Sequence, residues 1–152
     1  MKKILVATDG SPSALKAYAT AVRLAEQESG SSIVLFCVAP LSYLDLATPY
    51  ASMSGTAILP EQLESQLNQN ADQRLDTTLK SVATQVPVKT QKLLAHPGDA
   101  ICTLADEEKV DLIVIGAQGH SKLREFFTGS VTDYVVRHCH QPVLVVKAEN
   151  PH

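Results

Sequence analysis

The run Leu112-Ile113-Val114-Ile115 constrains the fold most, because a segment of four successive apolar residues has no polar face that could be exposed to water. Such a run is typical of a parallel strand that is buried on both faces of its sheet. Ile4-Leu5-Val6-Ala7, near the start of the chain, has the same character. Two strands of this kind require a layer of helices on each side, so we expect a three-layer α/β/α sandwich.

Strand and helix patterns alternate along the rest of the chain, which implies parallel pairing with right-handed crossovers. Helices are expected after Ser11-Pro12, from Pro60 to about Val82, after His96-Pro97, and up to about Cys139. The predicted strands are residues 3–8, 32–38, 88–95, 112–115 and 142–146. Placing the two most apolar strands centrally gives a five-stranded parallel sheet of order 3-2-1-4-5. Residues 1–152 are treated as a single domain in which residues 41–59 form an irregular segment.

Charge and composition narrow the class of function. The formal net charge is −3 and the pI is about 5.9, so the chain offers no overall attraction to nucleic acid or to an anionic membrane. Any phosphate binding must therefore be local. The apolar run after Lys2 and Lys3 ends at Asp9-Gly10, too soon for a signal peptide, and no run reaches membrane-spanning length. We expect a cytoplasmic protein.

The three cysteines, Cys37, Cys102 and Cys139, are odd in number, far apart and without paired metal-ligand spacing. They are predicted to be reduced, buried, small hydrophobic residues. His138 and His140 flank Cys139, but two histidines two positions apart on a helix point in different directions, and no metal site is predicted.

A glycine-containing loop follows the strand at residues 112–115. Gly116 is followed by two residues, then Gly119, nine residues and Gly129-Ser130, after which Val131, Tyr134 and Val135 recur at helical spacing. A loop that enters the first turn of a helix presents unpaired backbone N–H groups and the positive end of the helix dipole. Glycines let the backbone approach an anion closely, and Ser130 adds a hydroxyl that could also cap the helix. The pattern predicts a phosphate site, although glycines in a loop can equally serve turn geometry alone.

The motifs ILVATDGS, HPGDAI, VDLIVIGAQGHS, GSV and PVLVVK together resemble the universal stress protein family, in its ATP-binding branch, across nearly the full chain. The resemblance implies an adenine nucleotide alpha hydrolase-like fold and an ATP site, with or without Mg²⁺. It also implies that Ala7, Thr8 and Asp9 line the adenine and ribose, and that Val38 touches the adenine. The other implied contacts, around ribose and phosphates, are Ile115, Gly116, Gly119, His120, Ser121, Gly129, Ser130 and Val131.

Asp9 has two interpretations from the residues themselves. A carboxylate at the mouth of a parallel sheet can accept a hydrogen bond from a ribose hydroxyl or hold hydrated Mg²⁺, but it can also form an Asx turn with Gly10. A larger residue at Gly116 or Gly129 is expected to weaken ATP binding while the fold survives, because both glycines are placed at the rim of the sheet.

No catalytic residue is assigned. His120 lies in the loop without a visible orienting partner or nucleophile, and no lysine follows the last glycine as in the phosphate loop of ordinary NTPases. The leading hypothesis is an ATP-binding module that regulates a stress response. The alternatives are a slow ATP-hydrolysing enzyme and an interaction protein that binds no nucleotide. The apolar last strand, at an edge of the sheet, predicts a homodimer through residues 142 to 147.

Overall fold

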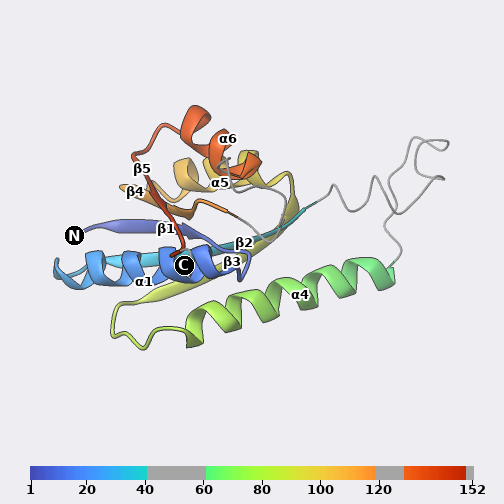
Figure 1. Cartoon of the computed structure of the whole chain (residues 1–152), viewed down its shortest axis with the longest axis horizontal. Helices are drawn as coiled ribbons and strands as arrows, with labels where there is room; N and C mark the ends of the chain where they lie inside the picture. The colour runs from blue at the N-terminus through green and yellow to red at the C-terminus, as the bar shows by residue number, and fades with distance from the viewer. Residues whose placement is uncertain (41–60, 119–128, 150–152) are drawn as a thin grey trace.

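The computed structural model describes residues 1–40, 61–118 and 129–149 of the 152-residue chain. Strands and helices alternate throughout these residues (Figure 1). The elements are β1 (Lys3–Ala7), α1 (Pro12–Glu26), β2 (Ser32–Pro40), α4 (Glu61–Lys80), β3 (Val88–Ala95), α5 (Pro97–Glu107), β4 (Leu112–Gly116), α6 (Ser130–His138) and β5 (Val143–Val146).

Within the described residues, the strands form one five-stranded sheet of order β3-β2-β1-β4-β5. All four neighbouring pairs are parallel, which confirms the predicted order. The apolar runs of β1 and β4 lie at the centre, where Ile4, Val6 and Val114 are fully buried. Both β1 and β4 have apolar side chains on each face, and their central position in the sheet keeps both faces away from water.

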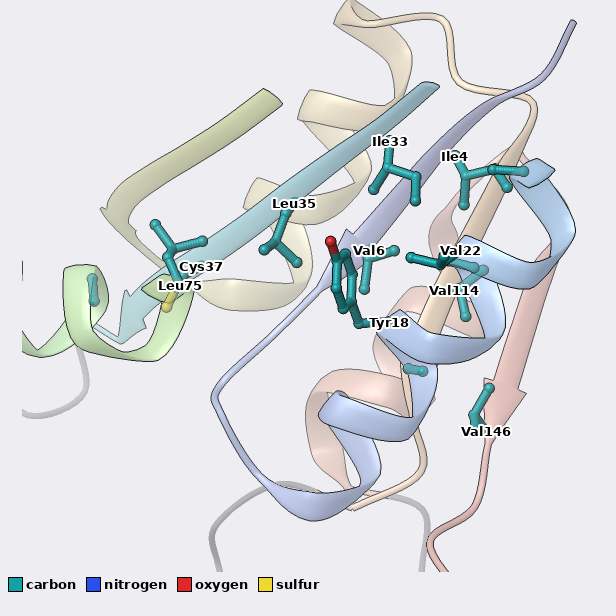
Figure 2. Packing of buried hydrophobic residues seen from close by; sticks show 14 residues of the cluster. Ile4, Val6, Tyr18, Val22, Ile33, Leu35, Cys37, Leu75, Val114 and Val146 are labelled. Carbon is teal, nitrogen blue, oxygen red and sulfur yellow. The ribbon is translucent and has the colours of Figure 1, made fainter. Parts of the chain in front are cut away.

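Helices cover both faces of this sheet, α1 and α4 on one side and α5 and α6 on the other (Figure 1). Figure 2 shows the apolar cluster beneath α1 and α4, where Tyr18 of α1 lies among the central strands and Leu75 of α4 lies beside Cys37. On the opposite face Leu5, Phe36 and Ile113 pack against α5 and α6. The alternating side chains of each strand therefore supply two cores.

The helix boundaries follow local signals in the sequence. The Ser11 side chain accepts a hydrogen bond from the Ala14 N–H, and Pro12 opens α1, as predicted. The helix ends at Glu26, before Gly30, which has φ of +81° and lies in the turn that leads to β2. Strand β2 continues to Pro40, beyond the predicted end at Val38, because its pairing with β3 extends to Ala95.

The prediction that all three cysteines are reduced is wrong for two of them. Cys102 of α5 and Cys139, which caps α6, form a disulfide, with their Cα atoms 4.9 Å apart. The two residues are 37 positions apart in sequence, and the packing of α5 against α6 brings them together. Cys37 remains a free, buried thiol, as expected.

The amino end of the sheet carries an ionic cluster around Glu108, which follows α5. Its carboxylate accepts hydrogen bonds from Lys3 Nζ, from Lys89 Nζ at 2.6 Å and from Gln91 Nε2 at 3.0 Å. The hydrogen bond from Lys3, followed by that from Lys89, lowers the pKa of Glu108 from 4.5 to about 2. Because the folded-state pKa lies below that of the unfolded chain, the ionised carboxylate stabilises the fold above about pH 4.5. This contribution is lost as the pH falls towards 2.

We expect Glu108→Gln to lower the melting temperature at pH 7 by roughly 2–4 °C, since the lysines then lose their ionic partner. The difference from wild type should shrink below pH 4.5 and vanish only below pH 2, where the Glu108 carboxyl is protonated in the folded protein as well. Thermal unfolding followed by circular dichroism across this range measures the effect. Glu107→Gln, at the exposed neighbouring carboxylate, is the control. A difference that persists unchanged to low pH would contradict the ionic explanation.

No helix among the described residues is long and apolar enough to cross a membrane.

Candidate functional site

The predicted site lies at the carboxyl end of the sheet, where β1 and β4 end side by side. Ala7 is paired with Ile115 in register, and Thr8 continues the strand direction by donating its N–H to the Phe36 carbonyl at 2.9 Å. Strand ends from opposite parts of the chain are therefore brought together at the switch point of the sheet, which is where open parallel sheets bind ligands.

The turn after β1 is fixed by its own side chains. Asp9 Oδ1 accepts the Ser11 N–H at 2.9 Å, and Gly10 has φ of +75°. This is the Asx turn of the alternative interpretation, with Gly10 as its central residue and the Ser11 N–H as the donor. Thr8 Oγ1 accepts the Gly10 N–H at 3.1 Å and lies 2.8 Å from Thr78 Oγ1 of α4. The Thr8 hydroxyl is therefore engaged inside the protein, on the α4 side of the sheet.

Gly116 faces α1 at very short range. A Cβ atom on Gly116 would lie 2.5 Å from Ser13 Oγ, 2.8 Å from the Ser13 carbonyl carbon and 2.9 Å from the Ala14 nitrogen. Ser13 Oγ donates a hydrogen bond to the Gln118 carbonyl, which joins the start of α1 to the segment after β4. Gly116 is thus packed directly against α1, so we predict that substitution there lowers the stability of the fold, contrary to the expectation from the sequence.

The loop after β4 is closed at its base by two hydrogen bonds. The Gly129 N–H donates to the Ala117 carbonyl at 2.9 Å, and Thr132 Oγ1 donates to the Gly116 carbonyl at 2.8 Å. Gly129, not Ser130, is the N-cap of α6, and Ser130 is the exposed first residue of the helix. The N–H groups of the first turn, from Ser130 onward, have no carbonyl partner within α6 and are suited to an anion.

Half-buried apolar side chains border the core on the α5–α6 side of the sheet. Ala7, Val38 and Val131 are partly exposed at the edge of the core on the α5–α6 side, and Ile115 is buried in it. Ala95, at the end of β3, is partly buried against the same apolar cluster and was not predicted as a site residue. Four of the predicted residues, from four elements, thus share one apolar cluster, of the kind that receives a flat ring system.

Arg74 of α4 is a second residue that the sequence did not single out. Its backbone carbonyl accepts the Thr78 hydroxyl at 2.7 Å, and its Cγ lies 3.4 Å from the position of a Cβ on Gly10. Burial raises the pKa of the Cys37 thiol to about 11, and the nearby side chain of Arg74 opposes this shift. Arg74 lies on the side of α4 that carries the buried residues Ala71 and Thr78, but because its side chain is charged, the apolar stripe of the helix gave no signal for it.

Three predicted contacts, Gly119, His120 and Ser121, lie outside the described residues, as does the segment at residues 41–59. Among the described residues, no group of three histidine, cysteine, aspartate or glutamate side chains could hold a metal ion.

Comparison with known protein families gives a match across nearly the whole chain. The sequence profile of the universal stress protein family matches residues 1–147. The chain belongs to the universal stress protein family. It is 34% identical over 152 residues to the universal stress protein Sll1388 of Synechocystis, a match that covers 95% of this chain and 97% of that protein.

Solved structures of similar proteins share the fold. Hypothetical protein MJ0577, from Methanocaldococcus jannaschii, superimposes with a TM-score of 0.81 at 27% identity and covers 99% of this chain and 98% of its own. A universal stress protein solved in complex with cAMP has a TM-score of 0.60 at 25% identity and covers 97% of this chain and 98% of its own. Some structural neighbours of this family member therefore bind nucleotides.

Proposed function

We propose that this universal stress protein binds ATP at the carboxyl end of its sheet and acts as a regulatory module in a stress response. The observation that carries the proposal is that Val131, in the first turn of α6, shares one apolar rim with Ala7 and Val38 at the ends of β1 and β2. The rim suits an adenine ring, and the first turn of α6 suits phosphate oxygens. The nucleotide found in a solved relative supports the same ligand class.

The chemistry of this end of the sheet favours binding over catalysis. The formal charge of the chain is −3, so attraction to phosphates must come from local N–H groups and from the dipole of α6. Asp9, half-buried beside the end of β1, would accept a hydrogen bond from a ribose hydroxyl or hold hydrated Mg²⁺. The Gly-x2-Gly-x9-Gly-Ser loop would complete the phosphate site, with Gly119, His120 and Ser121 as further contacts.

We further propose that the protein is a single domain over residues 1–152, is cytoplasmic and forms a homodimer through residues 142 to 147. In the part of the chain that the structure describes, β5 is an outer strand of the sheet. Leu144 is 37% exposed, and Val143 and Val145 are half-buried. An apolar outer strand with open backbone groups is a hazard that pairing with a second copy removes.

Titration of the purified protein with ATP and GTP, each with and without Mg²⁺, tests the nucleotide proposal. We expect ATP to bind more tightly than GTP, and mass spectrometry of nucleotide released from freshly purified protein should identify an adenine nucleotide. Ser130→Ala should weaken ATP binding about 10-fold, because one hydrogen bond to a charged oxygen is lost.

The control is Ser29→Ala, at an exposed serine in the turn before β2, at the opposite end of the sheet. It should leave ATP affinity unchanged. Failure of the wild-type protein to bind ATP with or without Mg²⁺ would overturn the proposed function. An equal loss of affinity in both serine variants would show that the ligand is not at α6.

A further inference from the structure

The Cys102–Cys139 disulfide joins two helices on the same face of the sheet. Cys102 lies in the middle of α5, and Cys139 is the residue at which α6 ends. Both cysteines are half-buried, whereas Cys37 is fully buried on the other side of the sheet, among residues of α1 and α4. The bridge is therefore within reach of a small reagent that Cys37 is shielded from.

Helix α6 depends on outside contacts for its order, because it has only nine residues and a helix of this length is unstable alone. Its middle is anchored through Val135, which is fully buried, and through the Tyr134 hydroxyl, which donates to Asp99 of α5. Its start is tied to β4 through Thr132. Tyr134 also lies directly over Gly98, where a Cβ atom would be 2.4 Å from the Tyr134 ring.

The last turn of α6 has weaker non-covalent support. His138 stacks on Tyr134 of the same helix, and beyond the helix Gln141 donates a hydrogen bond to Asp106 at 2.7 Å, between exposed groups. His140 Nδ1 lies 3.5 Å from the carboxylate of Asp106, and both side chains of this pair are largely exposed. Contacts of this kind contribute little, so the disulfide is the strong restraint at this end of the helix.

The two ends of α6 serve different parts of the molecule. Cys139 holds the carboxyl end, and Ser130 and Val131 present the N–H groups that the proposed function assigns to phosphate. A helix fixed at both ends presents these groups in one geometry, and a helix released at one end must be ordered when the ligand binds.

We propose that Cys102 and Cys139 are a reversible thiol–disulfide pair whose oxidation state controls the order of α6 and, through it, nucleotide affinity. The second half of this proposal rests on the proposed function. In the reductive step, a thiolate of a small dithiol attacks one sulfur of the bridge, and the other cysteine leaves as a thiolate. The second thiolate of the reagent then attacks the mixed disulfide, so that the products are two protein thiols and one cyclic disulfide. The dithiol loses the two electrons that the protein gains, and its two protons end on the protein thiols. In the oxidative step the same two exchanges run in reverse, and a small disulfide takes up the two electrons and the two protons.

The first test counts accessible thiols by alkylation and mass spectrometry. Without reductant the folded protein should take up no label, because two cysteines are bridged and Cys37 is buried. After dithiothreitol, the folded protein should take up label at Cys102 and Cys139, with Cys37 labelled only in denaturant. A bridge that resists dithiothreitol until the protein is unfolded, or two thiols that an oxidant cannot join, would overturn the proposal.

The second test follows α6 by hydrogen exchange. On reduction, the amides of residues 131–139 should exchange at least about 10-fold faster, and the melting temperature should fall by roughly 5–10 °C. Cys102→Ala should behave like the reduced wild type and should not respond to dithiothreitol, whereas Cys37→Ala should keep the full response. Exchange in α6 that is the same in both oxidation states would overturn the proposal, whatever the protein binds.

The third test measures ATP affinity of the oxidised and reduced protein, and we expect reduction to weaken binding about 5- to 10-fold. Equal affinity in the two states, with the hydrogen-exchange response present, would overturn the control of binding and leave the pair as a switch of α6 order alone. If neither state binds ATP, the proposed function fails, and the hydrogen-exchange result still decides whether the pair controls α6.

Discussion

Gly116→Ala should lower the free energy of unfolding by about 2–3 kcal/mol, and Gly116→Val should prevent stable folding. The reason is packing of backbone against backbone, since a Cβ at this position would meet the Ser13 carbonyl carbon at 2.8 Å and the Ala14 nitrogen at 2.9 Å. Neither atom can rotate away as the end of a side chain could. Urea unfolding of Gly116→Ala measures the loss of stability directly. For Gly116→Val, the yield of folded protein after expression is the measurement, and we expect it to be close to zero.

A double variant separates the two sources of the clash. Ser13→Ala removes the Oγ atom that would lie 2.5 Å from the new Cβ, but it leaves both backbone contacts in place. We therefore expect Gly116→Ala with Ser13→Ala to regain little of the lost stability. A full recovery would show that the serine side chain alone conflicts with a larger residue, and a change below about 0.5 kcal/mol in Gly116→Ala would show that α1 can move aside.

Val145→Pro is expected to convert the proposed dimer into a monomer of 16.3 kDa while the protomer stays folded. The carbonyl of Pro142 accepts a hydrogen bond from Ile113 of β4, and that of Val146 accepts one from Ala117, the residue after β4. Backbone groups in a parallel ladder alternate in direction every residue, so the N–H of Val145 points away from β4. Proline at this position removes an outward donor and leaves the pairing with β4 intact. Sedimentation velocity of wild type and variant at the same concentration measures the change.

The opposite edge of the sheet provides a matched control. The Ile33 N–H donates to the Pro87 carbonyl, so the same alternation directs the N–H of Thr90 outward from β3. Thr90→Pro should leave the dimer intact. A wild-type monomer would exclude the dimer, and dissociation by both prolines or by neither would place the contact elsewhere.

The order of the strands could be predicted because it depends on patterns that are local in sequence. The apolar runs of β1 and β4 indicate central strands, and the mixed pattern of β3 indicates an edge, independently of how the helices pack. The start of α1 could be predicted for the same reason, because Ser11 and Pro12 cap and begin the helix that directly follows them in sequence. For the candidate site, the same patterns placed the ends of β1 and β4 side by side, and the structure adds the register of Ala7 with Ile115.

Features that depend on contact between distant segments could not be predicted in this way. A glycine at position 116 signals that a side chain is missing, but the sequence does not show that α1 fills the space. The pairing of Cys102 with Cys139 depends on how two helices lie on the sheet, and a separation of 37 residues carries no information about that. Arg74 belongs to the candidate site through the packing of α4 alone.

The position of β1 between β2 and β4 has a consequence for synthesis on the ribosome. Lys3 donates its N–H to Asp111, and this hydrogen bond joins residues 108 positions apart. At translation rates of about 5–20 residues per second, the nascent chain carries β1 for roughly 5–20 s before β4 exists to cover it. During that interval one edge of β1 lacks its partner strand, and the side chains of Ile4, Leu5 and Val6 are without the cover that the completed sheet later gives them.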